Sequence, residues 1–508
     1  MKRFFALALI GALALGVSSV VYANVCAFDP VPAASLLFPF VAYDYDGGFS
    51  GDTTIFSITN VSAEAQIVHV TVWTDFSVAI LDFNILLTGY DVQRINIRDI
   101  LANGQLPVTK IEHHTTSEGV FANGPVSPQN TLNGAWVGVP PYRLDDPEET
   151  YDLGPDRCSV DDLAYPGQYV TPIQASNLQL FKSWLQSSQT GAWFHSDSCI
   201  RPFGGAYQLS PSPWMYLRDE TDPTWMYITA DVVQTCNLTF PDNPTYWTPY
   251  FEQGEARYDN VLIGDVTWLS NTDRLSEMNN AVHLEADLDL ARVATIKPDG
   301  FPISFYSRYS NPVLLSDYRE PLPTAWAFRY QGYGVDGLDT LIRAWKGSTN
   351  SRFIYDLMFD PETESPDTFI ASNCNAYTYY AWDEDENVLS TTSLPWSQPG
   401  GARVVPNLLP LETQEVSIDQ FDLVNDFGWL LFVWPASNYD TIDNINFPDY
   451  YQTWMGAKYV KTGDYSAAVS GAVMANFNCF SDQVIPNLGI NYNYVNQGGY
   501  VTSPSIFE

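Results

Sequence analysis

The stretch that decides the fold runs from Asp52 to Asp99 and reads DTTIFSITNVSAEAQIVHVTVWTDFSVAILDFNILLTGYDVQRINIRD. It holds four runs rich in β-branched and aromatic residues, separated by short polar segments, at 53–59, 66–73, 79–86 and 91–97. Runs of this length with turn-forming residues at each join predict a meander of antiparallel strands. The second run alternates between two sets of side chains, Val68, Val70 and Val72 against Ile67, His69, Thr71 and Trp73. This period of two predicts that one strand face contacts a core and the other lies nearer water.

The composition of the 508-residue chain favours several ordered β domains. The length exceeds one ordinary core, so about two to four domains are expected. Charged residues make up only 16% and aromatic residues 15%, and the many tyrosines, prolines and glycines favour strands and turns over helices. The net charge of −36 argues against a nucleic-acid partner and against electrostatic docking on anionic lipid.

The N-terminus predicts export. Lys2-Arg3 followed by the apolar run FFALALIGALALG has the form of a signal peptide over 1–23. No later stretch of the sequence is apolar enough to span a membrane. We therefore expect a protein of the periplasm, the cell surface or the extracellular medium. In such a compartment six cysteines predict up to three disulfides, whose pairing stays open: Cys26, Cys158, Cys199, Cys236, Cys374 and Cys479.

The predicted fold class is mainly β, with tandem Ig-like or fibronectin-like sandwiches, a loop-rich, disulfide-tied middle region and little helix. After the signal peptide at 1–23, the expected parts are an N-terminal β-sandwich at 24–140, a loop-rich excursion at 141–225, a middle β domain at 226–335 and a C-terminal β-sandwich at 336–508. One short helix is expected within the excursion at about 177–188, capped by Ser176.

The last third of the chain repeats the opening pattern. Asp339-Thr340-Leu341-Ile342 resembles Asp52-Thr53-Thr54-Ile55, and the run from Gly428 to Val433 resembles the run from Gly134 to Val139. These similarities predict that the C-terminal sandwich is a duplicate of the first.

The densest set of potential ligands lies in AVHLEADLDLA, residues 281–291. His283, Glu285 and Asp287 share one face of a predicted strand, because positions two apart point the same way. Oxygen-rich ligands favour calcium or another hard cation, and neighbouring carboxylates also suit acid–base chemistry. The plain alternative is the solvated face of an amphipathic strand.

Two further groups are candidates for a binding site. Arg319 and Glu320 lie among apolar residues before a Pro-rich turn, which predicts a structural ion pair or, alternatively, a carboxylate-binding arginine. Four tryptophans are either core residues or platforms on which sugars stack: Trp214, Trp225, Trp247 and Trp268.

Four short motifs together resemble a family of uncharacterised secreted proteins of Gram-negative bacteria: LLFPF at 36–40, LDFNI at 81–85, HLEAD at 283–287 and REPLP at 319–323. The motifs are spread over most of the chain. The resemblance implies an exported bacterial protein and supplies no catalytic residues.

Three functions remain open. The first is a non-enzymatic exported protein with a structural, adhesive or assembly role, whose partners would be cell-surface components, matrix components or copies of itself. It is favoured because the sequence has no GxSxG, HExxH, P-loop or Rossmann pattern. The second is a carbohydrate-binding or carbohydrate-active protein, with glycans as partners. The third is a surface module stabilised by calcium.

Overall fold

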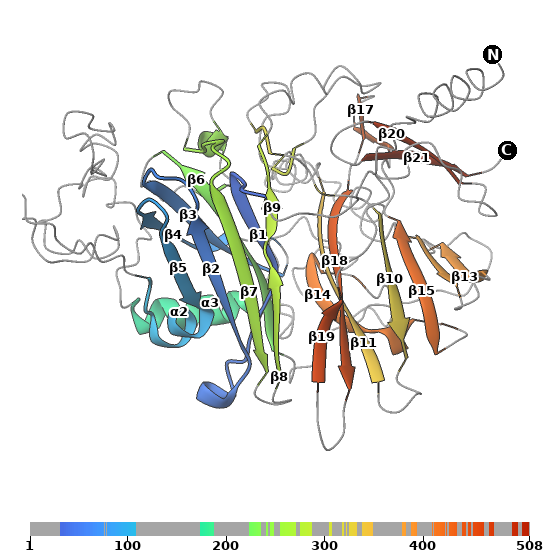
Figure 1. Cartoon of the computed structure of the whole chain (residues 1–508), viewed down its shortest axis with the longest axis horizontal. Helices are drawn as coiled ribbons and strands as arrows, with labels where there is room; N and C mark the ends of the chain where they lie inside the picture. Colours follow the sequence, from blue (N-terminus) through green and yellow to red (C-terminus); the bar gives the residue numbers. More distant parts are fainter. Residues whose placement is uncertain are drawn as a thin grey trace, which may run out of the picture.

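The structure of the chain is a computed structural model, shown in Figure 1. Most of the described part is β, and its strands form antiparallel sheets, as the sequence predicts. The residues that the structure describes are 31–75, 77, 79–107, 173–186, 223–234, 240–241, 244–247, 255–270, 275–286, 304–306, 317–319, 322, 325–332, 338–348, 378–382, 388–393, 409, 411–421, 423, 426–433, 439–442, 445–448, 451–461, 467–471, 490–495 and 500–506.

Two facing sheets form the first sandwich. Sheet I has the strand order β4-β3-β6-β1-β9 and sheet II the order β5-β2-β7-β8. The strands of sheet I are β1 (Ser35–Tyr43), β3 (Gln66–Thr74), β4 (Ala79–Leu87), β6 (Thr224–Val233) and β9 (Val282–Leu284). The strands of sheet II are β2 (Thr53–Asn60), β5 (Val92–Asn96), β7 (Leu262–Ser270) and β8 (Leu275–Asn280). Aromatic side chains fill the space between the sheets, where the rings of Phe38 and Phe56 lie 4.8 Å apart.

The second sandwich has two sheets of four strands each. Sheet III has the order β10-β15-β12-β13 and sheet IV the order β14-β11-β18-β19. The strands of sheet III are β10 (Ala325–Gln331), β12 (Thr378–Trp382), β13 (Val388–Ser393) and β15 (Phe427–Val433). The strands of sheet IV are β11 (Leu338–Ser348), β14 (Thr413–Ser417), β18 (Tyr451–Lys461) and β19 (Ala467–Gly471).

Smaller elements complete the described part. Two short hairpins join β16 (Tyr439–Ile442) to β17 (Ile445–Pro448) and β20 (Ile490–Val495) to β21 (Tyr500–Ile506). Helix α2 (Ile97–Asn103), which the sequence pattern did not reveal, follows β5 directly. Helix α3 (Ala175–Leu185) is the expected helix, but its N-cap residue is Gln174, whose side chain makes no capping bond, rather than Ser176. Three 3₁₀ turns are η1 (Gly48–Ser50), η4 (Pro244–Trp247) and η6 (Ile418–Gln420).

The two sandwiches share one topology. Sheet II, β5-β2-β7-β8, corresponds strand for strand to sheet IV, β14-β11-β18-β19. The order β4-β3-β6-β1 in sheet I corresponds to β13-β12-β15-β10 in sheet III, so that β9 is the additional strand of the first sandwich. Equivalent strands also follow one another in the same order along the chain.

Three interactions between or at the ends of strands recur at equivalent positions and fix the alignment. The Thr54 hydroxyl bonds to both backbone groups of Ala42, and the Thr340 hydroxyl does the same with Gln331. The Trp268 indole donates to the carbonyl of Phe40, and the Tyr459 hydroxyl donates to the carbonyl of Arg329. Asn96, the last residue of β5, and Ser417, the last residue of β14, each cap the turn that follows by accepting from Arg98 N–H and Asp419 N–H respectively.

This alignment changes the sequence-based one. Thr340 is equivalent to Thr54 rather than to Thr53, so the expected pairing of the two segments is one residue out of step. The run from Gly428 to Val433 lies in β15, which holds in its sheet the place of β6. Its expected counterpart, the run from Gly134 to Val139, lies outside the described residues.

Sheet membership also differs from the expected division of the chain. The expected N-terminal sandwich at 24–140 is incomplete by itself, because β6 to β9 lie in the two sheets of the first sandwich. The expected middle domain at 226–335 therefore supplies strands to both sandwiches, since β10 lies in sheet III. Local hydrophobic patterns identify strands but not their partners: β6 pairs with β1 and β3 across a long stretch of intervening sequence.

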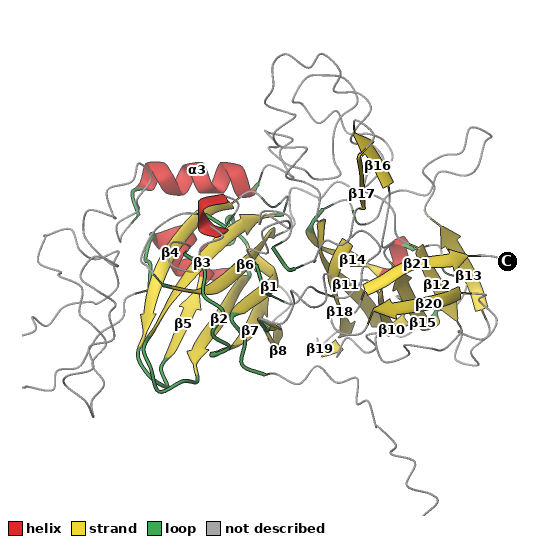
Figure 2. Cartoon of the chain, turned by 90° about the horizontal axis from the view of Figure 1, so that it is seen from above, coloured by secondary structure: helices red, strands yellow, loops and turns green. Residues whose placement is uncertain are grey.

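The two sandwiches lie side by side (Figures 1 and 2) and share one hydrophobic core. Sheet IV approaches sheet I: the Thr413 hydroxyl donates to the carbonyl of Pro39 over 2.6 Å, and the Glu412 N–H donates to the carbonyl of Asp75 over 2.9 Å. Both faces of β3 are buried, so the prediction that one of its faces lies nearer water is wrong. The covering groups come from distant parts of the chain, which a local pattern does not encode.

Candidate functional site

A row of polar residues crosses sheet I on the face that points away from sheet II. Ser35 on β1 pairs with Asp231 on β6, Asp231 with His69 on β3, and His69 with Asn84 on β4. Because Phe38 packs on Phe56 of sheet II, Ser35, three positions earlier, points to the outer side. No side chain in this row is more than 1% exposed. A row of buried polar groups is costly unless each finds a partner.

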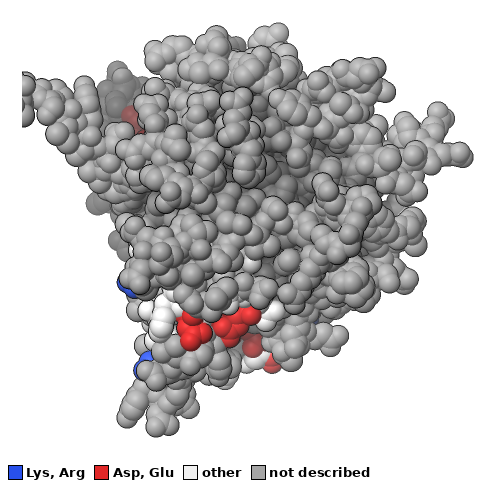
Figure 3. Space-filling model, turned by 90° about the vertical axis from the view of Figure 1, so that its right-hand side faces the viewer, with Lys and Arg blue, Asp and Glu red and all other residues white. Residues whose placement is uncertain are grey.

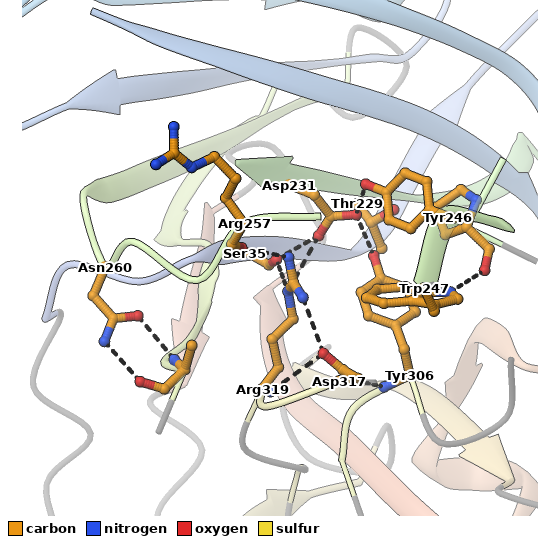
Figure 4. Close-up of polar contacts among 12 residues, drawn as sticks. Ser35, Thr229, Asp231, Tyr246, Trp247, Arg257, Asn260, Tyr306, Asp317 and Arg319 are labelled. Atoms are coloured by element: carbon orange, nitrogen blue, oxygen red, sulfur yellow. Dashed lines mark hydrogen bonds and ion pairs between the residues drawn. The ribbon is translucent and has the colours of Figure 1, made fainter. Parts of the chain in front are cut away.

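Asp231 is the centre of the hydrogen bonds in this row (Figure 4). One carboxylate oxygen accepts from the Ser35 hydroxyl, and the other accepts from the Tyr246 hydroxyl at 3.0 Å and the Tyr306 hydroxyl at 2.8 Å. The two tyrosines come from the connections that follow β6 and β9. Segments remote in sequence thus cover the outer face of sheet I and satisfy its buried carboxylate.

Arg319 balances the negative charge. Its guanidinium lies 3.6 Å from Asp231 and donates to Asp317 at 2.9 Å, to the Ser35 hydroxyl and to the carbonyl of Arg257 at 3.2 Å. The rings of Trp247, Tyr258 and Tyr306 lie 5.2 to 5.5 Å from the guanidinium carbon. Arg319 itself is 0% exposed. Its planar donors are used by fixed protein acceptors, as in a structural ion pair.

Electrostatics keeps this cluster in one protonation state. Burial raises the pKa of Tyr246 and of Tyr306, and the charge of Asp231 raises both further, so both hydroxyls remain neutral donors. Burial works to lower the pKa of Arg319, but Asp231 and Asp317 outweigh it, and the net pKa lies above its usual range. Tyr246, Tyr306 and Arg319 therefore all keep their protons at neutral pH.

His69 belongs to the same row. Its Nδ1 donates to the Asn84 side-chain oxygen at 3.0 Å, and its Nε2 lies 3.6 Å from the carboxylate of Asp82. Burial lowers the pKa of His69, against the raising influence of Asn84 and Asp231. The ring is therefore neutral at neutral pH.

A second buried ion cluster joins the two sandwiches. Arg343 on β11 donates to Glu415 on β14 at 2.7 Å and to Glu277 on β8 of the first sandwich at 3.0 Å. Its guanidinium carbon lies 4.6 Å from the centre of the Phe40 ring and 4.3 Å from that of Trp268. Burial works to raise the pKa of Glu415, but Lys458 and Arg343 outweigh it, and the net pKa lies below its usual range.

The structure places the expected ligand strand beside Arg319. Backbone groups of Ala286 and Arg319 form a β-bridge, which brings the strand of His283 and Glu285 next to this cluster. The His283 ring bonds to two backbone groups, donating through Nδ1 to Val31 at 2.7 Å and accepting through Nε2 from Gly264 at 3.2 Å. This histidine therefore holds three backbone segments together. Glu285 is half-buried, and Asp287 and Glu320 lie outside the described residues.

The described tryptophan candidates are buried. Trp225, Trp247 and Trp268 are 5%, 2% and 6% exposed, so none of the three presents an open ring face to a sugar. The Trp247 indole donates to the carbonyl of Pro241 at 2.6 Å, in addition to its contact with Arg319. Trp214 and the six cysteines, Cys26, Cys158, Cys199, Cys236, Cys374 and Cys479, lie outside the described residues.

Sequence reasoning missed most members of the two ion clusters. Asp231 is the one member that the sequence could have revealed. It is the only charged residue in the run TWMYITADVV, and a charge in such a strand needs a buried partner. Nothing local distinguishes Asp317, Tyr246 or Tyr306, because their roles depend on where the connections fold back onto the sheet.

The described residues contain neither a group of metal ligands nor a membrane-spanning helix. No group of three or more His, Cys, Asp or Glu side chains in that part of the chain is arranged to hold a metal ion. Within the same residues, no helix has the length and apolar character needed to cross a membrane.

In comparisons with known proteins, no family model, no curated protein and no solved structure matches the chain.

Proposed function

We propose that this chain is an exported, non-enzymatic protein with a structural, adhesive or assembly role at the bacterial cell surface or outside the cell. The observation that supports this best is the use made of its buried polar groups. Arg319 pairs with both Asp231 and Asp317, and Asp231 accepts from neighbouring hydroxyls, where an active site would leave a reactive group open to substrate.

The joining of the two sandwiches supports the same proposal. Arg343 connects both sandwiches through buried carboxylates, and the hydrophobic core is continuous across them. A two-sandwich body of this kind suits a spacer or building block that transmits load. The signal-peptide form of residues 1–23 supports an exported location. The acidic composition suits a protein outside the cell, because a strongly charged surface resists non-specific binding.

The experiment expresses the chain with its leader in a Gram-negative host, separates the cell fractions, and measures binding of the purified mature protein to cells and matrix. We expect the protein outside the cytoplasm and bound to cells, matrix or itself. Glu285→Gln, at a half-buried candidate carboxylate, should leave binding unchanged within about twofold, because such a surface substitution perturbs little. Cytoplasmic retention, or glycan hydrolysis that Glu285→Gln abolishes while the fold persists, would overturn the proposal.

A further inference from the structure

Equivalent outer faces of the two sandwiches differ in how far their aromatic side chains are exposed to solvent. In the first sandwich the outer face of sheet I carries Tyr227 and Trp73, whose rings stack 5.7 Å apart and are 3% and 1% exposed. Trp345 of sheet IV lies edge-on against Tyr227 at 5.7 Å. The outer face of sheet IV, the face away from sheet III, thus covers this part of sheet I.

On the equivalent face of sheet III two described aromatic side chains are exposed. Phe427 pairs with Gln331 as Trp225 pairs with Ala42, and Trp429 pairs with Trp382 as Tyr227 pairs with Trp73. Trp429 and Phe427 are 38% and 39% exposed, whereas their equivalents Tyr227 and Trp225 are 3% and 5% exposed. Exposed aromatic side chains gathered on one sheet face are typical of an interaction surface.

A candidate partner face exists on the same chain. Sheet II is the equivalent of sheet IV, so its outer face, away from sheet I, corresponds to the surface that covers Tyr227. This face is open to solvent: Met278 is 69% exposed and Val92 is 56% exposed, and Asp265 is also exposed.

We propose that the outer face of sheet III binds the outer face of sheet II of a second copy of this chain, which repeats between molecules the contact made within one. This inference rests on the assembly role proposed above and names its partner. Because the two faces differ, the contact is head-to-tail, and its repetition gives rings or open filaments.

The equivalence of the two contacts identifies the residues that would meet between molecules. Within the chain, Arg343 of sheet IV meets the ring of Phe40. Ser57 is equivalent to Arg343, because they lie three positions after the matched residues Thr54 and Thr340. Arg329 is equivalent to Phe40, because the backbone carbonyls of these two residues accept the matched side-chain hydrogen bonds described above. The Ser57 hydroxyl donates to Asp265 at 3.1 Å. The repeated contact therefore brings Arg329 of the next molecule over Ser57, where Asp265 and Arg94, both exposed, flank Ser57 on the two neighbouring strands.

The long-range charge of the chain opposes association. Among the described residues on the side shown in Figure 3, acidic side chains gather below the middle of the view, and Lys or Arg side chains lie only at one margin. With a net charge of −36, copies repel one another at low ionic strength. The contact should therefore be measured at about 0.15 M salt, where the screening length is about 8 Å.

The test is sedimentation velocity of the full mature protein over a concentration series. Wild type should show a weight-average mass that rises with concentration. Asp265→Arg and Arg329→Asp each place like charges at the contact, so each alone should need at least about tenfold more protein for the same association. Mixed in equal amounts they restore opposite charges at every contact and should associate like wild type. Phe49→Glu, at an 83% exposed residue of η1 outside both faces, is the control and should behave like wild type.

A second variant tests the head-to-tail geometry. Trp429→Glu blocks only the sheet III face, so its mixture with Asp265→Arg should stop at a one-to-one dimer. A wild type that stays monomeric, single variants that associate like wild type, or a mixture that fails to recover would each overturn the proposal. Glycan binding by a monomeric wild type that Trp429→Glu abolishes would overturn it as well and assign the face to sugars.

The two proposals fail separately. If self-association is absent but the exported protein still binds cells or matrix, only the docking contact is disproved. If the protein neither binds cells or matrix nor associates with itself, the structural role proposed for the chain is disproved too.

Discussion

The two sandwiches place very different residues at one and the same position in their sheets. In the first, the row across sheet I reads Ser35, Asp231, His69 and Asn84. The equivalent row in sheet III reads Ala325, Val433, Thr378 and Ser393. The charged row occurs where long connections and Arg319 cover the sheet, and the uncharged row occurs on the other sandwich. One topology thus supports a buried ion cluster on the first sandwich, whereas the equivalent strand positions of the second hold residues without charge.

The difference extends to sheets II and IV. Ser57 of sheet II bonds to exposed Asp265, while its equivalent Arg343 of sheet IV is buried between two glutamates. Positions that are polar and solvent-facing in one sandwich are interface positions in the other. Two units of one topology can differ in their contacts through such outer positions alone, because the core between the sheets is not involved.

The largest expected effect comes from removing Arg319 from the buried ion cluster of the first sandwich. Arg319→Met leaves the carboxylates of Asp231 and Asp317 buried without their cation, so we expect a loss of about 3–5 kcal/mol in the free energy of unfolding. Chemical denaturation followed by tryptophan fluorescence measures this loss. The matched control is Arg94→Met on β5, an exposed arginine whose loss should cost less than about 0.5 kcal/mol. Similar effects of the two substitutions would contradict the distinction between the covered and open faces.

The joint between the sandwiches should respond next. Arg343→Met removes the cation shared by Glu277 and Glu415, at an expected cost of about 2–4 kcal/mol. Calorimetry should show one unfolding transition in wild type and two in the variant, because the sandwiches lose their ionic link. Lys461→Met, at an exposed position of β18 in the same sheet, should keep the single transition. A single, unchanged transition in Arg343→Met would show that the two sandwiches unfold together without this ionic link.

A smaller effect is expected at Gly456 on β18. A Cβ atom there would lie 2.9 Å from the indole of Trp454, so Gly456→Ala forces that ring to move. Overpacking of this kind costs about 1–2 kcal/mol. Gly332→Ala is the control, because its Cβ would meet nothing closer than 3.4 Å. Equal midpoints of denaturation for the two variants would count against the close packing of sheet IV.

The smallest effect concerns pH and the first sandwich alone. Burial lowers the folded-state pKa of His69, so below its ordinary value near 6.5 the unfolded state takes up the proton more readily than the folded state. Stability from this residue is present above that pH and is lost as pH falls, by about 1 kcal/mol or less between pH 7 and 5.5. Melting curves of wild type and His69→Gln should therefore converge on acidification. A constant difference between them would rule out this linkage.

The sequence predicted the strands of the first sandwich well but not their partners. The runs at 53–59 and 66–73 match β2 and β3 closely, because alternation and turn residues are local properties. The pairing of β6 with β1 and β3 is not local, and neither is the burial of the outer face of sheet I. For that reason the sequence misjudged the exposure of His69.

The candidate site illustrates the same limit. Arg319 was recognised from its apolar surroundings as a member of an ion pair, but its partners Asp231 and Asp317 were not. Glu320, the partner expected from sequence, lies outside the described residues. His283 looked like a ligand because it alternates with carboxylates, yet its ring nitrogens are used by Val31 and Gly264. Spacing along a strand reveals a shared face but not what packs against it.

Hydroxyl-radical footprinting with mass spectrometry tests the central comparison most directly, because it reports the solvent access of single side chains. For the dilute, folded protein we predict rapid oxidation of Trp429 and Phe427 on β15 and strong protection of their equivalents Tyr227 and Trp225 on β6. Equal oxidation at the two strands, or protection of β15 with oxidation of β6, would contradict the account that the second sandwich covers the first and leaves its own equivalent face open.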